Sequence, residues 1–160
     1  MNSEASSPPI FHVVLVEPQI PQNTGNIGRT CLGTGCRLHL VRPLGFSLSE
    51  KAVRRAGLDY WKKVDLRVHE SLPLALRSFA PERLVFTSAR EGRAYTDHAF
   101  VPGQVIVFGR EADGLPEAIR SRHATQLIRI PLRGPIRSLN LANAVSVILF
   151  EGLRQLDMLH

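Results

Sequence analysis

Three short segments combine glycines with polar side chains, which suits binding of a ligand close to the backbone. In residues 23–29 (NTGNIGR), two glycines and two asparagines precede Arg29, whose guanidinium suits a phosphate or a carboxylate. Residues 108–116 (FGREADGLP) offer the carboxylate of Glu111 to a cation or a hydroxyl group. Residues 130–143 (IPLRGPIRSLNLAN) carry two asparagines, which need partners if they are buried. Taken alone, the first two segments fit ordinary connecting loops, whereas the third favours a polar site.

Apolar runs and helical spacings predict the elements that would carry these segments. The expected strands are residues 11–16, 37–41, 64–69, 84–87, 105–108 and 127–130. The expected helices are one that follows a loop at residues 23–29 and ends at Gly33 or Gly35, then residues 49–56, 72–79, 116–121 and a long one over 139–156, capped by Ser138. Strands that alternate with helices indicate an α/β fold with a mostly parallel sheet flanked by helices. Such sheets bind ligands at the carboxyl ends of their strands, where the three segments lie.

The composition is that of a globular protein. The chain has 160 residues, of which 44% are hydrophobic and 21% charged, so we expect one domain over residues 1–160 with a flexible tail at residues 1–9. No apolar run reaches the roughly 20 residues of a membrane helix. The polar start of the chain has no apolar signal region. We therefore expect a cytoplasmic protein with no membrane partner.

The charge balance favours anionic partners. The formal net charge is +6 and the sequence pI is about 10.1. Of the 20 basic residues, 17 are arginine, whose planar fork matches pairs of phosphate oxygens. GC-rich coding explains the same arginine bias equally well.

Common catalytic and metal-binding signatures are absent from the sequence. It contains no G-x-G-x-x-G, no G-x-x-x-x-G-K-[ST], no G-x-S-x-G and no H-E-x-x-H. The histidines are scattered, and His12 and His39 lie in strand patterns that indicate packing or edge roles. Cys31 and Cys36 are too few for a disulfide framework, and we expect reduced, partly buried thiols. With no Cys or His cluster at ligand spacing, we expect no metal site.

Taken in order, the motifs NTGNIGRTC, VFGREADGLP and IPLRGPIRSLNLANAVSV resemble those of the SPOUT class of AdoMet-dependent RNA methyltransferases. Within that class the chain is similar to the small tRNA (cytidine/uridine-34)-2′-O-methyltransferases. The opening VLVEPQIPQNTGNIGR and the phrase RRAGLDYW at residues 54–61 fit that subgroup, as does the absence of an added RNA-binding domain. The resemblance covers residues 11 to about 156.

The resemblance implies a parallel α/β sheet whose C-terminal part forms a deep trefoil knot, the SPOUT fold. It implies a homodimer in which each active site is built from both protomers. The cofactor would be S-adenosyl-L-methionine, released as S-adenosyl-L-homocysteine, with no metal. The methyl group would pass to the ribose 2′-hydroxyl of the wobble nucleotide, C or modified U at position 34. The partner would be the anticodon stem-loop of tRNA, and not DNA.

The resemblance also assigns roles residue by residue. Arg29 matches the catalytic arginine of the class. Because a guanidinium stays protonated and is a poor base, we expect Arg29 to orient the neighbouring phosphate and lower the pKa of the hydroxyl, although a base role stays open. The cofactor would be held by Thr87, Gly109, Glu111, Ile130, Leu132, Ser138, Leu139 and Asn140. The RNA would be contacted by Asn26, Arg54, Arg55, Tyr60 and Arg137, although a solvated basic helix explains the stretch around Arg54 and Arg55 equally well.

Two positions depart from the pattern of the class. Ala142 stands where many members carry a serine, so a hydroxyl contact is lost there. Gly28 replaces a bulkier apolar residue. Three other readings stay open: an RNA-binding module without chemistry, a methyltransferase for rRNA or another tRNA position, and a knotted scaffold without activity. The small size disfavours ribosomal targets by analogy alone, and the retained polar residues disfavour an inactive scaffold.

Overall fold

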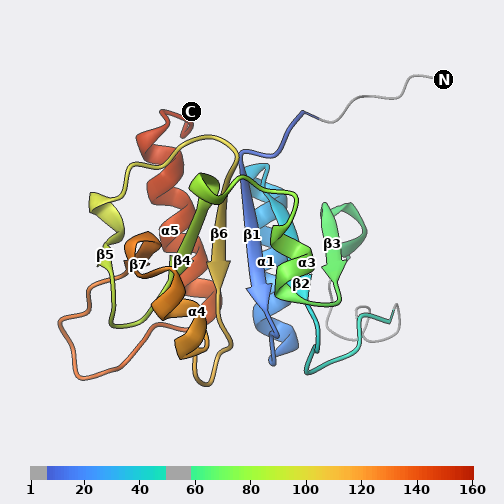
Figure 1. Ribbon diagram of the computed structural model, residues 1–160. Helices are drawn as coiled ribbons and strands as arrows, with labels where there is room; N and C mark the ends of the chain where they lie inside the picture. The colour runs from blue at the N-terminus through green and yellow to red at the C-terminus, as the bar shows by residue number, and fades with distance from the viewer. Residues whose placement is uncertain (1–6, 50–58) are drawn as a thin grey trace.

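The computed structural model describes residues 7–49 and 59–160 as a sheet between two layers of helices (Figure 1). The strands are β1 (Phe11–Val16), β2 (Arg37–Val41), β3 (Leu66–His69), β4 (Leu84–Thr87), β5 (Arg93–Ala94), β6 (Gln104–Phe108) and β7 (Leu127–Arg129). The helices are α1 (Pro21–Thr34), α3 (Leu72–Leu76), α4 (Glu117–Arg122) and α5 (Leu141–Gln155), with short 3₁₀ helices at Trp61–Lys63, Pro81–Arg83, Tyr95–Asp97 and Ala124–Gln126. Of the expected basic helix, residues 50–56, which include Arg54 and Arg55, lie outside the described residues.

The seven strands form one sheet in the order β3-β2-β1-β6-β4-β7-β5, and the strand pairs described are all parallel. β1 lies near the centre, with Val14 aligned to His39 of β2 on one side and to Val107 of β6 on the other. The prediction of an α/β fold with a mostly parallel sheet flanked by helices is confirmed. Parallel strands of this kind are apolar along their whole length because helices cover both faces.

Alternate residues of β1 serve two hydrophobic cores, as the two-residue period of a strand requires. Phe11, Val13 and Leu15 face the core shared with α1 and α5. Val14 and Val16 face the core shared with α3 and α4. In Figure 1, α1 and α5 lie behind the sheet and α3 and α4 in front of it. The sheet is therefore held between a pair of long helices and a pair of short ones.

The expectation of a loop at residues 23–29 is wrong, because α1 already begins at Pro21. Proline suits the first helical turn, where its missing N–H has no partner to lose. The two glycines of the segment weaken a helix on propensity alone. Here they let aromatic rings approach: the Tyr60 hydroxyl donates to the carbonyl of Gly25 at 2.9 Å, and a Cβ on Gly28 would lie 2.6 Å from Cζ3 of Trp61. Tertiary packing therefore overrides local propensity.

The cap expected at Ser138 is also wrong. The N-cap of α5 is Asn140, whose side chain accepts hydrogen bonds from the backbone of Ala142 and Asn143. The two-residue strand β5 was not expected from the sequence, since two residues give no periodic signal. The other helix and strand ends differ from expectation by one to three residues at most.

The last strand of the chain is inserted between two earlier ones. β7 pairs with β4 on one side and with β5 on the other. Residues 130–140 then lead from β7 to α5, which packs beside α1 behind the sheet. This connection brings the third polar segment beside the carboxyl ends of β4 and β6.

Three histidines that are distant in sequence form a hydrogen-bonded row across β1, β2 and β3. Nδ1 of His12 lies 2.9 Å from Nε2 of His39, and Nδ1 of His39 lies 2.9 Å from Nε2 of His69. The ring of Phe79 packs edge-on against His12 and His39. The packing roles expected for His12 and His39 fit this row. Burial, together with the charge of Arg37, lowers the pKa of His12 to about 4. Burial, followed by the charges of His12, His69 and Arg37, lowers the pKa of His39 to about 3.

We expect Gly152→Ala to lower the free energy of unfolding by about 1–3 kcal/mol. A methyl group on Gly152 of α5 would lie 2.8 Å from Cζ and 2.9 Å from Cε2 of Phe11, in the centre of the larger core. The matched control is Gly33→Ala on an open part of α1, where the added Cβ meets nothing within 4 Å. It should raise the free energy of unfolding by up to about 1 kcal/mol. Urea unfolding of both variants measures the difference, and equal stability of Gly152→Ala and the parent chain would contradict the packing.

The histidine row predicts a loss of stability in mild acid. Its pKa values are lowered in the folded state, so unfolding takes up protons as the pH falls below about 6.5, the ordinary value. The free energy of unfolding should drop on the order of 2 kcal/mol between pH 6.5 and 5. His39→Gln, which cannot titrate, should show a flatter dependence in that window. Urea titrations at pH 7.5, 6.5 and 5 compare the two chains, and parallel pH curves would count against the row as the cause.

Candidate active site

A cavity of about 430 Å³ lies at the carboxyl ends of β4, β6 and β7. Its walls come from the ends of these strands, the loop at residues 109–115 and the segment that leads to α5. Seven of the eight residues expected to hold the cofactor line it, namely Thr87, Gly109, Glu111, Ile130, Leu132, Ser138 and Leu139. The eighth, Asn140, is not part of the lining. Three segments separated in sequence are thus brought to one site.

The floor of the cavity is apolar and its rim is basic. Phe108, Leu115, Leu141 and Ile148 contribute hydrophobic side chains. Arginines that the sequence did not single out also line it, namely Arg90, Arg110, Arg120 and Arg129. Their positions were hidden because only the fold brings the loops after β4 and β6, helix α4 and strand β7 to one cavity. The Arg137 side chain, expected to contact RNA, lines the cavity as well and is exposed.

The loop after β6 is folded back on itself. Arg110 and Gly114 exchange backbone hydrogen bonds, of 2.9 Å from the Gly114 N–H and 3.3 Å from the Arg110 N–H. A Cβ on Gly109 would overlap the backbone of Gly114 and Leu115, so only glycine fits at this point. The tight turn beside the cavity therefore depends on the glycine at residue 109.

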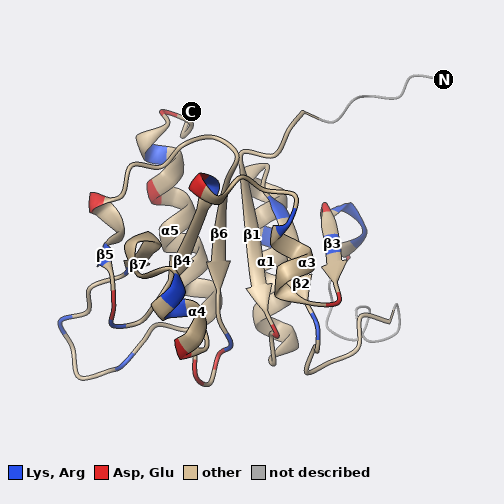
Figure 2. Cartoon of the chain, viewed as in Figure 1, with Lys and Arg blue, Asp and Glu red and all other residues tan. Residues whose placement is uncertain are grey.

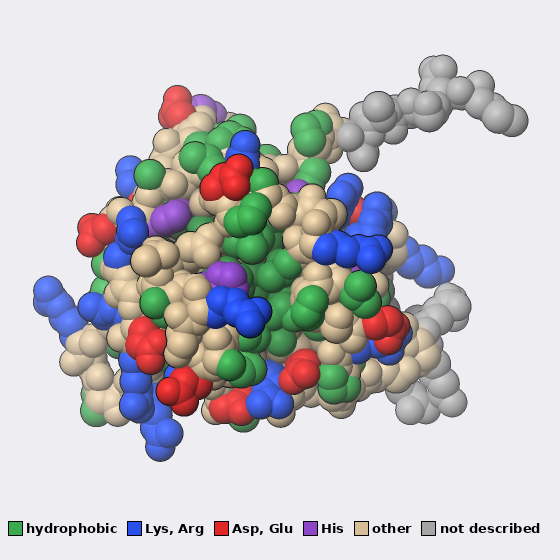
Figure 3. Space-filling model, in the orientation of Figure 1, with side chains coloured by type: hydrophobic (Ala, Val, Ile, Leu, Met, Phe, Trp, Pro, Cys, Tyr) green, Lys and Arg blue, Asp and Glu red, His purple; other side chains and the backbone are tan. Residues whose placement is uncertain are grey.

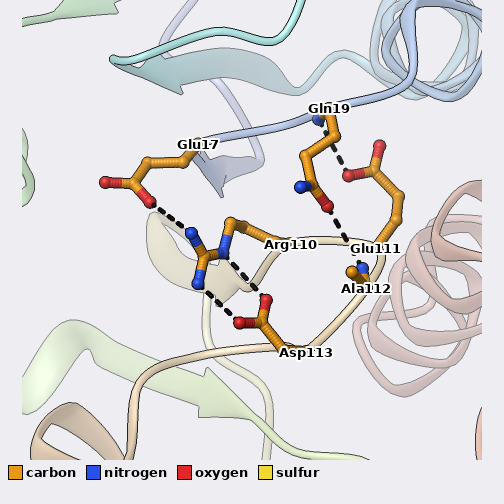
Figure 4. A network of polar contacts seen from close by, with 6 residues as sticks. All are labelled: Glu17, Gln19, Arg110, Glu111, Ala112 and Asp113. Atoms are coloured by element: carbon orange, nitrogen blue, oxygen red, sulfur yellow. Dashed lines mark hydrogen bonds and ion pairs between the residues drawn. The ribbon is translucent and has the colours of Figure 1, made fainter.

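The carboxylate of Glu111 binds the start of α1 (Figure 4). It accepts the backbone N–H of Gln19 at 2.9 Å and that of Ile20 at 3.0 Å. Ile20 is the N-cap of α1 and has no side-chain acceptor of its own. Glu111 therefore supplies from another loop the negative charge that a helix start favours. The sequence suggested a carboxylate offered to a ligand, whereas the structure uses both its oxygens within the chain.

A second set of contacts runs beside the first (Figure 4). The guanidinium of Arg110 donates to both carboxylate oxygens of Asp113 and to Glu17 at 3.3 Å. The hydrogen bond from Arg110 to Asp113 raises the arginine pKa further above its usual value. The side-chain oxygen of Gln19 accepts the backbone N–H of Ala112 at 3.2 Å. The loop after β6 is thus held to the segment after β1 by two separate contacts, Arg110 to Glu17 and Ala112 to Gln19.

Asn23 connects the three polar segments and was not singled out from the sequence. It is buried, and its Nδ2 lies 3.4 Å from Glu111. Its Oδ1 accepts a hydrogen bond of 3.0 Å from Nδ2 of Asn140. Oδ1 of Asn140 in turn accepts the backbone N–H of Ala142 at 2.9 Å. Asn140 thus binds the start of α5 and Asn23 of α1 rather than lining the cavity. The sequence signal that could have identified Asn23 is its place as the first residue of the NTGNIGR motif.

Arg29 lies on the exposed side of α1 and does not line the cavity of its own chain. Its guanidinium sits 5.6 Å from the ring centre of Tyr60. Tyr60 is partly buried, which raises the pKa of its hydroxyl. Asn26 is exposed on the same helix, one turn earlier, and its carbonyl accepts the Thr30 hydroxyl at 3.2 Å. Asn26 and Arg29 therefore lie on α1 with Tyr60 packed against that helix, apart from the cavity residues.

The two departures from the class pattern have local explanations. Gly28 leaves space for the ring of Trp61, which a larger residue would displace. Ala142 is buried in the first turn of α5, so no hydroxyl is present there. Cys31 and Cys36 are both free and buried. No group of three potential metal ligands occurs within residues 7–49 and 59–160.

None of the helices in the described part of the chain is long and apolar enough to cross a membrane.

Comparison with known proteins places these features in a family. The model of the SpoU rRNA Methylase family matches residues 10–150. The tRNA (cytidine(34)-2'-O)-methyltransferase of Burkholderia ambifaria is 47% identical over 150 residues, which cover 91% of this chain and 96% of the relative.

Solved structures agree. One, described as giving structural insights into the 2-OH methylation of C/U34 on tRNA, has a TM-score of 0.84 at 45% identity and covers 94% of this chain and 99% of that one. AviRb of Streptomyces viridochromogenes, solved with AdoMet, has a TM-score of 0.74 at 26% identity, covering 94% of this chain and 60% of its own. With its three polar segments joined through Asn23, Glu111 and Asn140, the chain belongs to the SpoU methylase family, within the SPOUT RNA methyltransferases.

Proposed function

We propose that this chain transfers the methyl group of S-adenosyl-L-methionine to the ribose 2′-hydroxyl of the wobble nucleotide of tRNA, C or modified U at position 34. The observation that carries the proposal is the cavity lined by the second and third motif segments, to which Asn23 joins the first segment through Glu111 and Asn140. The relative from Burkholderia ambifaria, which carries this activity in its name, spans nearly the same length.

The cavity fits the proposed cofactor. Its volume of about 430 Å³ lies within the range of small-molecule sites. The apolar side chains of Leu115, Leu141 and Ile148 suit an adenine ring, while the tight turn at Gly109 offers backbone groups at close range. We propose that Thr87, Gly109, Ile130, Leu132, Ser138 and Leu139 hold AdoMet, with Glu111 and Asn140 positioning the loops around it. When bound, this cofactor supplies a methyl group activated by its sulfonium charge, and the chemistry as proposed needs no metal.

The chain's own residues have to orient the ribose and assist loss of its proton. Arg29 is exposed and free of carboxylate partners among the described residues, so its fork can bind the phosphate next to the target ribose. A positive charge there lowers the pKa of the 2′-hydroxyl, and the proton passes to phosphate or water. Tyr60, which lies beside Arg29, limits the directions in which the guanidinium can turn.

We further propose that two copies of the chain share each active site. Arg29 does not line the cavity of its own chain, so a second copy has to bring its arginine to that cavity. The outer faces of α1 and α5 expose Leu32 and Phe150, at 38% and 49% of their surface. These helices lie side by side, with the hydroxyls of Thr30 and Ser146 3.4 Å apart. Apolar side chains on adjacent helices suit a homodimer contact.

The C-terminal segment is proposed to form a deep trefoil knot. The support is the strand order, in which β7 enters between β4 and β5 before the chain returns behind the sheet as α5. Knots are rare because chains seldom thread through loops already formed. We also propose that the protein works in the cytoplasm as a single domain, on the anticodon stem-loop and on neither DNA nor membranes.

The deciding experiment is nucleoside mass spectrometry of tRNA from cells that lack the activity, after incubation with the chain and AdoMet. A 2′-O-methylated cytidine or uridine derivative confined to the wobble fragment is the expected result. AdoMet binding without a methylated wobble nucleotide would indicate another RNA substrate. A chain that binds RNA but neither binds AdoMet nor makes product would be an RNA-binding module.

Arg29→Ala should lower the methylation rate by at least about 100-fold, because a preorganised charge at the reacting group is lost. Affinity for AdoMet, measured by calorimetry, should stay close to that of the parent chain, since Arg29 lies outside the cavity. Arg77→Ala, an exposed arginine that follows α3, is the control. Loss of AdoMet binding in Arg29→Ala would make it a cofactor residue instead.

Gly109→Ala should weaken AdoMet binding by about 10-fold or more, because its Cβ forces the loop of Gly114 and Leu115 open. Gly134→Ala, in the segment before α5, makes the same chemical change where the Cβ meets nothing within 4 Å and should bind normally. Calorimetry measures both, with thermal unfolding to confirm that each chain is folded.

Mixing the two inactive chains then tests whether the site is shared. In a heterodimer of Arg29→Ala and Gly109→Ala, one site would receive the intact arginine of one copy and the intact cavity of the other. Recovery of activity on mixing is expected. If Arg29 and the cavity of each active site came from the same copy instead, the mixture would stay inactive.

A further inference from the structure

Arginines around the cavity divide into paired and unpaired ones. Among the described residues, ion pairs hold Arg37, Arg42, Arg67, Arg110, Arg120 and Arg154. The guanidinium groups of Arg90 and Arg137, which line the cavity, have neither an ion pair nor a hydrogen bond among residues 7–49 and 59–160. The same holds for Arg133, which follows the lining residue Leu132. Three unpaired cations therefore lie at or beside one rim.

The part of the rim that comes from β7 and the loop after it lacks acidic residues. Between Glu117 and Glu151 the chain has five arginines and no aspartate or glutamate. Arg133 and Arg137 belong to the loop between β7 and α5, where Figure 2 shows basic and no acidic positions. The space-filling view shows basic side chains projecting from the edge of the molecule below β5 and β7 (Figure 3). Net positive charge is concentrated beside the proposed methylation site.

Arg90 faces the rim from a different loop. It lies in the turn that follows β4, where the Ser88 hydroxyl accepts the backbone N–H groups of Arg90 and Glu91 at 3.3 and 3.1 Å. The neighbouring Glu91 is not available to Arg90 as its main partner, because it pairs with Arg120 at 3.2 Å. The turn holds the backbone while the guanidinium of Arg90 stays exposed.

We propose that Arg90 and Arg133, with Arg137, bind backbone phosphates of the RNA on either side of the nucleotide that enters the cavity. This inference rests on the proposed function, since it assigns the substrate's path across the same site. Exposed guanidiniums without carboxylates release counterions when they meet phosphates, which gives affinity without reading the base sequence. Cations on two loops across one mouth would hold the strand over the cavity.

The proposal assigns the arginines to RNA rather than to the carboxylate of the cofactor. Arg133 lies outside the cavity lining, and both Arg90 and Arg133 are exposed on the rim. Arg77 and Arg122 provide a matched control pair. They are also exposed arginines whose side chains have no ion pair or hydrogen bond among residues 7–49 and 59–160, and neither lines the cavity. A general effect of net charge would act on both pairs alike.

The experiment compares Arg90→Gln/Arg133→Gln with Arg77→Gln/Arg122→Gln, using an anticodon stem-loop RNA and fluorescence anisotropy over a range of KCl concentrations. In the rim variant, the magnitude of the negative slope of log association constant against log salt concentration should decrease by about 1 to 2, as expected for the loss of two phosphate contacts. The control pair should keep the parent slope. In turnover assays the rim variant should show a raised KM for RNA with kcat near that of the parent, and calorimetry should show unchanged AdoMet affinity.

An unchanged slope in the rim variant would overturn the proposal, and so would an equal fall in the control pair. A loss of AdoMet affinity would assign the arginines to the cofactor instead. The binding assay needs no turnover, so its result is separate from the proposed function. If the parent chain does not methylate tRNA but the rim variant still shows a weaker salt dependence of RNA binding, the proposed reaction is rejected and the proposed RNA-binding role of the arginines stands.

Discussion

One carboxylate holds the site together. Glu111, which follows the last residues of a buried strand, accepts the N–H groups at the start of α1 and lies within reach of the Asn23 amide. Asn23 passes the connection to Asn140, which caps α5. Each of the three motif segments therefore contributes one member of a single polar chain. The cavity beside it keeps its shape because the two long helices and the loop after β6 are fixed to one another.

The physical need for this arrangement begins at the start of α1. A helix leaves its first N–H groups without partners, and Ile20 has no side-chain oxygen to offer them. Supplying the acceptor from another loop makes the helix start depend on the tertiary fold. It also removes the desolvation cost of a buried amide, since the Asn23 side chain has a partner on either side. Glu111 thus orients the helix that carries Arg29 and also belongs to the loop after β6 that lines the cavity.

Periodicity predicted the sheet and most helices, because apolar runs and helical spacings are local signals. It failed at residues 23–29, where two glycines and two asparagines indicate a loop to any local rule. There the helix is stabilised by contacts from distant residues: Tyr60 on Gly25, Trp61 against Gly28 and Glu111 at the helix start. The cap at Asn140 was missed in favour of Ser138 for a similar reason, since only the direction of the incoming chain decides between two adequate caps.

For the site, the motifs predicted which segments are brought together but not which contacts each residue makes. Glu111 and Asn140 were expected against the cofactor, whereas their polar atoms are engaged with helix starts. The arginines of the rim could not be ranked from the sequence, because pairing with a carboxylate distinguishes Arg120 from Arg90 and depends on the fold. The row of histidines across three strands is another product of parallel register, which aligns residues far apart in the chain.

Because β7 lies between β4 and β5, the sheet cannot be assembled in the order in which a ribosome delivers it. β5 pairs with β7 in the described sheet, so it emerges before its partner strand exists. β4 likewise keeps one edge open until the residues from Leu127 onward have been made. An open strand edge is a template for pairing with other chains. Until residues 127–129 have been made, the growing chain therefore has an unpaired strand edge at β4 inside its future sheet, where a wrong strand can pair.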